Sequence, residues 1–344
     1  MRRMITVSAP GKVHLIGEHA VIYGEPAIIA AIDKRCYVDA EKSDKIKITS
    51  RELNKSVAFE IEDVLSFTQE VSELWDRCHE KGNFSGLFSK MKQDGLNYAK
   101  VAVGKSLKSI GINGGVGLNI KSDIPFGSGV GSGAALAVSV VKAISELYGK
   151  KLSLDEINKI AFEIEKIAHG TPSGGDNAVC CYGGLIWFEK RASENTMRSL
   201  KKDVPYKLEN FVLVYTKNPE RSTGEMVQLV RNLEENYRNL RIKNLGGLTS
   251  EMLDALKNIN FLKMKEIINE TQRNLAELGA STMEIDELAF VVREIGGAAK
   301  LCGAGGGGIV LCYHENKSKL METIKGLGYR PIETELGVEG VRVE

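Results

Sequence analysis

Apolar residues alternate with polar ones, or form short β-branched runs, mainly in the first fifty residues of the chain. Such patterns are typical of strands, because successive side chains of a strand point to opposite faces. The strands expected from them are Ile5–Ala9, Ala27–Ile32, Tyr37–Glu41, Ile46–Ser50 and, later in the chain, Gly117–Lys121. The first half of the chain is therefore expected to build a sheet before its helices.

Two helices are expected after the last of these strands. Apolar residues recur at helical spacing from Leu136 to Leu147, and Gly149 is a plausible stop for this helix. A second helix is expected to begin at Ser153, because Glu156 follows three residues later in a capping-box pattern. The stripe of apolar residues in this helix extends to Ile167.

The second half of the chain predicts strand, helices, hairpin, helix and strand in that order. Two or three helices are expected over residues 223–295. The other expected elements are the strands Phe211–Thr216, Ala298–Cys302, Ile309–Tyr313 and Arg330–Glu335 and the helix Ser318–Lys325. This order predicts a two-layer α+β domain. Because 344 residues exceed one comfortable core and residues 191–203 are polar, two domains are expected, 1–190 and 191–344.

Charge and cysteine content narrow the classes of function. A formal net charge of +1 argues against a broad nucleic-acid surface and against a polybasic membrane patch. No apolar run approaches the length of a membrane span, and the first residues lead into a strand rather than a signal peptide. The six cysteines lack metal-ligand spacing, and Cys180 and Cys181 are expected to be buried thiols rather than a disulfide. These features predict a cytoplasmic protein.

The glycine-rich segment between the fifth strand and the first helix is the strongest chemical signal. It reads Pro125-Phe126-Gly127-Ser128-Gly129-Val130-Gly131-Ser132-Gly133-Ala134-Ala135. Glycines let the backbone turn sharply and approach a ligand, and the helix that follows offers free N–H groups to an anion. We interpret the segment as a phosphate-binding loop; taken alone, it also fits a tight strand-to-helix turn.

The segment from Ala9 to Gly24 carries a second candidate group. Lys12 follows a Pro-Gly turn, so its ammonium can project into a cleft and stabilise a developing negative charge. Glu18 and His19 place an acceptor beside a titratable ring. Taken singly, each of these residues also fits an ordinary surface position.

A third candidate segment runs from Glu165 to Ala178. Glu165 and His169 lie four residues apart near the end of the expected helix and therefore share a face. Gly170 and Pro172 are expected to end that helix, and two further glycines allow a tight turn before Asp176. An aspartate held there can accept the proton of a substrate hydroxyl, although an Asx-turn or helix cap is an equally good interpretation without context.

A fourth segment, Gly303-Ala304-Gly305-Gly306-Gly307-Gly308, separates the two strands of the expected hairpin. A hairpin needs only one or two glycines. Close approach of the backbone to a bound ligand is the better explanation for so many.

Together the four segments resemble the GHMP superfamily of small-molecule kinases, and within it the mevalonate kinase family. The matching motifs are Pro10–Lys12 with Gly17–Val21, the phosphate loop Pro125–Ala135, His169–Ala178 and Gly303–Gly308. They occur in the family's order from residue 9 to residue 308, so the resemblance covers essentially the whole chain.

The resemblance implies ATP-dependent phosphorylation of mevalonate to 5-phosphomevalonate, in isoprenoid biosynthesis, with Mg²⁺ as cofactor. It implies that Asp176 is the catalytic carboxylate facing the C5 hydroxyl, and that Lys12 lies near that hydroxyl and the γ-phosphate. It further implies that Glu165 and a phosphate-loop serine hold Mg²⁺. The residues implied to line the acceptor pocket are Glu18, His19, Thr223, Gly303 and Ala304.

One position departs from the family pattern. The family's loop usually has a second serine where this chain has Gly133, and that serine is the one usually assigned to Mg²⁺. A water or the hydroxyl of Ser132 can take its place, since Mg²⁺ readily keeps waters. Our hypothesis is that activity survives with weaker affinity for the metal.

The resemblance also implies a fold and leaves other functions open. The fold is an N-terminal mixed α/β domain similar to ribosomal protein S5, followed by a ferredoxin-like domain, with the active site between them. Family members are often dimers, so a homodimer is one expectation. The alternatives are a related kinase acting on phosphomevalonate, homoserine or a sugar, and a kinase-fold sensor without turnover. The retention of Lys12 and Asp176 speaks against the sensor.

Overall fold

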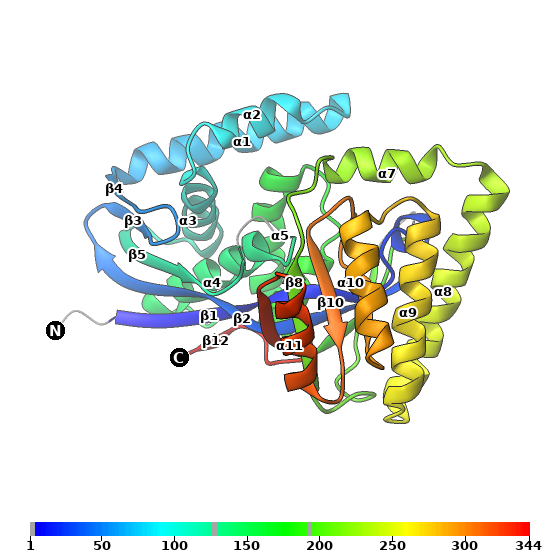
Figure 1. Cartoon of the computed structure of the whole chain (residues 1–344). Coiled ribbons are helices and arrows are strands. Elements are labelled where there is room, and N and C mark those ends of the chain that lie inside the picture. The colour runs from blue at the N-terminus through cyan, green and yellow to red at the C-terminus, as the bar shows by residue number, and fades with distance from the viewer. Residues whose placement is uncertain (1–3, 126–128, 192–194) are drawn as a thin grey trace.

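The computed structural model describes residues 4–125, 129–191 and 195–344. Within these ranges the chain forms one mixed α+β structure in which a large sheet carries helices (Figure 1). The strands are β1 Met4–Ile16, β2 Pro26–Ser43, β3 Ile46–Ser50, β4 Lys55–Phe59, β5 Gly115–Ser122, β6 Leu185–Glu189, β7 Thr196–Ser199, β8 Leu208–Tyr215, β9 Ala298–Leu301, β10 Ile309–Tyr313, β11 Pro331–Leu336 and β12 Arg342–Val343.

The helices fall into an N-terminal and a C-terminal group. The N-terminal group is the 3₁₀ helix Ala20–Tyr23, α1 Ile61–Lys81, α2 Ser85–Lys92, α3 Asn97–Ile110, α4 Ser132–Leu147, α5 Leu154–His169 and α6 Gly175–Tyr182. The C-terminal group is α7 Thr223–Arg231, α8 Glu235–Lys257, α9 Phe261–Glu277, α10 Met283–Glu294 and α11 Lys317–Gly326. Figure 1 shows α1 to α4 on the left of the view and α8 to α10 on the right, and the 3₁₀ helix contacts α8 of the C-terminal group.

The expectation of separate strands at Ala27–Ile32 and Tyr37–Glu41 is wrong, because both belong to the continuous strand β2. Its partner β1 also continues past Ala9 to Ile16. The two strands pair Pro10 with Arg35 but Gly11 with Ile32, so two residues of β2 bulge out between these pairs. The charged residues Asp33 and Lys34, which lie between the two expected strands, form this bulge.

The C-terminal half has the expected order of elements. Its strands lie in the order β11-β8-β10-β9, and every neighbouring pair is antiparallel. With helices between β8 and β9 and between β10 and β11, this is the expected ferredoxin-like arrangement. The expected helix count over 223–295 is wrong, since four helices are present. The side chains of Glu234 and Asn260 cap the N-termini of α8 and α9, and these caps divide the region into more helices than its polar pattern indicates.

The sheet continues from one half of the molecule into the other. Leu336 of β11 pairs with Ile32 of β2, and β12 pairs with β1. One buried apolar cluster likewise contains residues from both halves, for example Ile28 and Leu213. The domain limits 1–190 and 191–344 stay a prediction.

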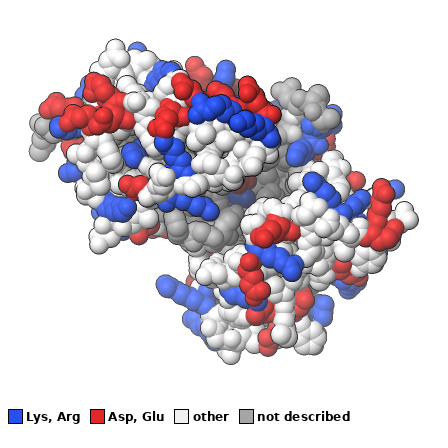
Figure 2. Space-filling model, turned by 90° about the horizontal axis from the view of Figure 1, so that it is seen from above, with Lys and Arg blue, Asp and Glu red and all other residues white. Residues whose placement is uncertain are grey.

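The cysteines agree with the expectation from the sequence, and one face of the surface mixes charges of both signs (Figure 2). On the face drawn in Figure 2, Lys and Arg side chains are interspersed with Asp and Glu. The cysteines are free thiols, and Cys180 and Cys181 are buried as expected. None of the helices that the structure describes is both long enough and apolar enough to cross a bilayer.

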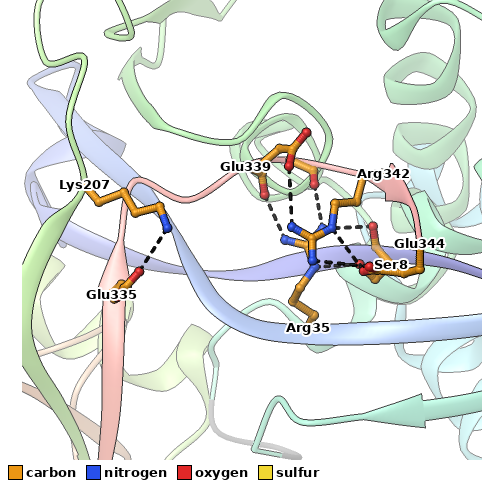
Figure 3. A network of polar contacts seen from close by, with 8 residues as sticks. Ser8, Arg35, Lys207, Glu335, Glu339, Arg342 and Glu344 are labelled. Atoms are coloured by element: carbon orange, nitrogen blue, oxygen red, sulfur yellow. Dashed lines mark hydrogen bonds and ion pairs between the residues drawn. The ribbon is translucent and has the colours of Figure 1, made fainter.

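The end of the chain is fastened to the first two strands by the buried guanidinium of Arg35 (Figure 3). Arg35 donates to the Ser8 hydroxyl at 2.6 Å and to the backbone carbonyls of Ser8, Glu339 and Gly340 at 3.0, 2.9 and 2.6 Å. The same terminal segment accepts a hydrogen bond from Gly184 at Val338. The terminal segment therefore packs directly behind the end of helix α6, which carries Asp176.

We expect R35M to lower the free energy of unfolding by about 3 kcal/mol, because it leaves one hydroxyl and three carbonyls, two of them buried, without their donor. The midpoint of urea unfolding measures the loss. R51M removes an exposed arginine and is the matched control, with an expected change within about 0.5 kcal/mol. Equal midpoints for R35M and R51M would contradict the role assigned to Arg35.

Candidate active site

A cavity of about 420 Å³ opens between the two halves of the molecule and is lined by segments that lie far apart in the sequence. Strand β1 and the loop after it supply Lys12, His14, Glu18 and His19, and helix α6 supplies Asp176. The remaining lining residues are Val21, Ile22, Gly129, His169, Pro219, Arg221, Thr223, Val227, Cys302, Gly303, Ala304, Gly305, Gly307 and Gly308. All four chemically suggestive segments of the sequence therefore reach one cavity.

Lys12 and Asp176 form an ion pair in this cavity, with Nζ 3.0 Å from Oδ2. The Lys12 side chain is 7% exposed and that of Asp176 is 36% exposed. Burial alone would lower the pKa of Lys12, but the Asp176 carboxylate more than offsets it and raises this pKa. Burial would raise the pKa of Asp176, but attraction to Lys12 outweighs it and holds this pKa below its usual value. Both groups are therefore charged at neutral pH.

The glycine loop fixes the position of Lys12 through its backbone. The Lys12 amide donates to the Val130 carbonyl at 2.9 Å, which ties strand β1 to the loop. Gly131 has φ +79°, and a β-carbon there would lie 2.7 Å from Lys12 Cγ. Only glycine fits such a position without strain. The expected strand–loop–helix order is confirmed, since α4 begins at Ser132.

The loop Gly303–Gly308 approaches the cavity from the C-terminal half and contacts the loop after β1. His19 Nε2 lies 2.9 Å from the Ala304 carbonyl. Burial lowers the pKa of His19, so its ring is neutral at neutral pH. Part of the glycine content is explained by packing within the chain, because a β-carbon at Gly307 would lie 2.9 Å from the Lys217 carbonyl. Gly303, by contrast, has open space at its α-carbon.

Glu18 is paired with Lys300, a residue that the sequence analysis did not single out. Lys300 Nζ donates to Glu18 Oε1 and to the carbonyls of His14 at 3.1 Å and Leu301 at 2.9 Å. The Lys300 and Glu18 side chains are 0% and 1% exposed. This ion pair joins strand β9 of the C-terminal half to the loop after β1. Its one signal in the sequence is a lysine inside an apolar strand.

Glu165 lies behind the phosphate loop and accepts a hydrogen bond at Oε1 from the Tyr98 hydroxyl. Its other oxygen lies 3.6 Å from His169 Nε2, which confirms that Glu165 and His169 share a helix face. Burial raises the pKa of Glu165, since its side chain is 3% exposed. Tyr98 is a second residue of this region that the sequence analysis missed.

The other expected site residues are placed as follows. Thr223 is the first residue of α7 and lines the cavity with Gly303 and Ala304. Pro125 follows strand β5, and Ala134 is buried in the first turn of α4 near Gly133. Gly127 and Ser128 lie outside the described residues.

Comparison of the sequence with known proteins identifies the family of this chain. Residues 97–184 match the GHMP kinases N terminal domain, and residues 252–326 match the GHMP kinases C terminal domain. The chain is 33% identical over 356 residues to the mevalonate kinase of Pyrococcus abyssi, covering 100% of this chain and 99% of that protein. The chain belongs to the GHMP kinase superfamily. Residues 2–42 of this kinase also match a galactokinase galactose-binding signature.

Solved structures support the same fold for this kinase. The crystal structure of the Methanococcus jannaschii mevalonate kinase has a TM-score of 0.81 and 26% identity, and it covers 97% of this chain and 98% of that one. The Lactococcus lactis galactokinase complexed with galactose has a TM-score of 0.75 at 20% identity, covering 99% and 95%. The second likeness concerns the fold alone.

The residues of this GHMP kinase fit a magnesium ion that enters with ATP. Among the described residues, no group of three or more His, Cys, Asp or Glu gathers into a metal site of its own. Mg²⁺ is usually held by one or two carboxylates together with substrate phosphates and waters, so no such group is required. The buried carboxylate of Glu165 and the hydroxyl of Ser132, at the start of α4, are donors of the type that Mg²⁺ prefers.

Proposed function

We propose that this kinase transfers the γ-phosphoryl group of ATP to the C5 hydroxyl of mevalonate. The observation that carries the proposal is the ion pair of Lys12 and Asp176, which stands in a cavity bounded by two glycine loops. Phosphoryl transfer needs positioning and neutralisation of charge more than covalent chemistry by the protein. The Lys12 ammonium, the Asp176 carboxylate and the N-terminus of α4 meet these requirements.

Asp176 orients the acceptor hydroxyl and takes its proton as the new bond to phosphorus forms. Its lowered pKa makes it a weak base before that point, which supports a late proton transfer. Lys12 holds a positive charge beside the hydroxyl oxygen and the transferred group. His14 lines the same cavity, and burial lowers its pKa to about 3, so it adds no competing positive charge at neutral pH.

Glu165 and Ser132 would hold Mg²⁺ with ATP. When bound, the ion neutralises charge on the β- and γ-phosphates. The first turn of α4 directs free backbone N–H groups toward the same phosphates. Glu18, His19 and Thr223 are proposed to contact the acceptor, since all three line the cavity.

Two acceptors have specific support. Mevalonate is favoured by the likeness to mevalonate kinases over the full length of the chain and by Arg221, a cation in the cavity lining that suits a carboxylate. Galactose is favoured by the signature matched at residues 2–42. A coupled assay of ADP release with mevalonate, phosphomevalonate, homoserine and galactose decides between them. Selective turnover of mevalonate supports the proposal, and turnover of another acceptor overturns the substrate.

We expect R221M to raise the KM for mevalonate about fivefold to tenfold with kcat little changed, equivalent to roughly 1 kcal/mol for one exposed charge pair. In this proposal Arg221 pairs with the carboxylate of the acceptor rather than with the transferred group, so it would bind ground and transition states equally. R231M, at an exposed position in the last turn of α7, the helix that begins two residues after Arg221, is the matched control. Steady-state kinetics measure both variants, and an unchanged KM in R221M contradicts the role of Arg221.

A further inference from the structure

Tyr98 links the three elements that surround the phosphate loop, although the proposed reaction does not use it. It is the second residue of α3, and its ring packs against the main apolar cluster. Its hydroxyl donates to Glu165 Oε1 on α5 and lies 3.1 Å from the Gly133 carbonyl on α4. A purely apolar contact needs no hydroxyl at this point, so the hydroxyl requires its own explanation.

The Tyr98 hydroxyl supplies a hydrogen-bond donor to Glu165, whose carboxylate is buried. Among the described residues, the one ion pair recorded for Glu165 is that with His169 at 3.6 Å, a long distance for a hydrogen bond. A buried carboxylate needs donors, and a phenol that donates to it forms a strong, charge-assisted bond. Tyr98 thus fixes Oε1, while Oε2 lies on the side of His169, which lines the cavity.

The space beside Glu165 is open where the phosphate loop has Gly133. A β-carbon at this position would lie 3.4 Å from Glu165 Oε1 and 3.6 Å from the Tyr98 hydroxyl, both ordinary contact distances. A serine therefore fits at position 133, and its hydroxyl would lie within reach of the same carboxylate oxygen. In this chain the hydroxyl found beside that oxygen comes from Tyr98.

We propose that Tyr98 is a positioning residue for the metal-binding carboxylate, and that its hydroxyl holds Glu165 in the orientation that a serine at position 133 would otherwise support. This inference rests on the proposed function, because the binding of Mg²⁺ by Glu165 is part of that proposal. Fixing one oxygen of Glu165 restricts the side chain to one preferred orientation, with the other oxygen on the side of His169. Residues that orient a metal ligand commonly change metal affinity by about 10- to 100-fold when they are replaced.

The test measures binding rather than turnover. Calorimetry gives the affinity for the non-hydrolysable ATP analogue AMPPNP with saturating Mg²⁺ and again in EDTA, and the ratio reports how strongly metal and nucleotide are coupled. We expect Y98F to reduce this ratio about tenfold with the affinity in EDTA unchanged. A merely structural role would change both affinities alike. Y148F is the matched control, since its hydroxyl also donates to a carbonyl, that of Gly115 at 2.7 Å, away from the cavity.

A second variant tests whether a serine at position 133 can replace the hydroxyl of Tyr98 in orienting Glu165. The double variant Y98F/G133S should recover most of the lost ratio, whereas G133S alone should change the ratio little because Tyr98 already holds Glu165. A serine that acted only as a metal ligand would raise the ratio equally in both backgrounds and would overturn the equivalence. A ratio in Y98F equal to that of the wild type overturns the inference, and a double variant as weak as Y98F overturns the equivalence with serine. If the wild type itself shows no dependence on Mg²⁺, Glu165 does not hold the ion with the nucleotide and the inference is overturned, whereas the proposed function stands or falls with the assay of ADP release.

Discussion

Replacing Asp176 with asparagine is expected to lower kcat about 10³-fold, within the range that removal of a general base produces. Asparagine has nearly the same shape but cannot accept a proton or pair with the Lys12 ammonium, which lies 3.0 Å away. The KM for the acceptor should change much less than kcat, because an amide can still hydrogen-bond the hydroxyl in the ground state. The assay of ADP release with mevalonate measures both constants.

Two controls separate chemistry from folding in this experiment. D44N removes an exposed carboxylate and should leave kcat unchanged. D176N also leaves the Lys12 charge buried without its partner, so its melting temperature has to be measured beside its activity. A D176N enzyme that melts as the wild type does and retains more than about a tenth of its kcat would rule out the catalytic role.

The parts of the site that could be predicted from the sequence are those encoded by local chemistry. The capping box at Ser153 and Glu156 is present, and α5 ends at His169 with Gly170 as its cap, as expected. The glycine loop leads into α4, because a run of small residues followed by an apolar stripe has few other conformations. Each of these features depends on residues only three or four positions apart.

Strand limits were predicted less well because pairing partners decide them. The charged residues Asp33, Lys34 and Arg35 interrupt the apolar pattern of β2, yet the strand continues through them. Neighbours on both sides hold it in place, since β1 pairs along one edge of β2, and β6 and then β5 pair along the other. A pattern read along one chain does not show which neighbours a strand will have.

The polar partners of the site could not be predicted, since they join residues far apart in the sequence. Tyr98 and Glu165 are 67 positions apart, and Glu18 and Lys300 are 282 apart. Glu18 and Glu165 stand in recognisable motifs, but nothing in those motifs indicates Lys300 or Tyr98 as the partner. Their importance comes from burial, because a buried charge without a partner costs several kcal/mol and therefore constrains what lies beside it.

The largest effect on stability is expected from K300M, which should lower the free energy of unfolding by about 4 kcal/mol. The substitution keeps the length of the side chain but leaves Glu18 as a buried carboxylate without its cation, and removes the donor to the His14 and Leu301 carbonyls. The urea midpoint measures the loss. K319M removes a lysine on the exposed surface and is expected to change stability far less.

The dependence on pH identifies the cause of this loss. Burial raises the pKa of Glu18, and Lys300 acts against this effect, so removing Lys300 raises the pKa further. Between the usual pKa of a glutamate and this raised value, the folded protein keeps a proton that the unfolded chain has released, so stability falls as pH rises. The difference between K300M and the wild type should therefore shrink as pH falls toward the usual pKa of glutamate. The double variant E18Q/K300M removes both charges and should be more stable than K300M at neutral pH. A loss that is independent of pH and equal in the double variant would mean that packing around residue 300, rather than the ion pair, holds the two halves of the site together.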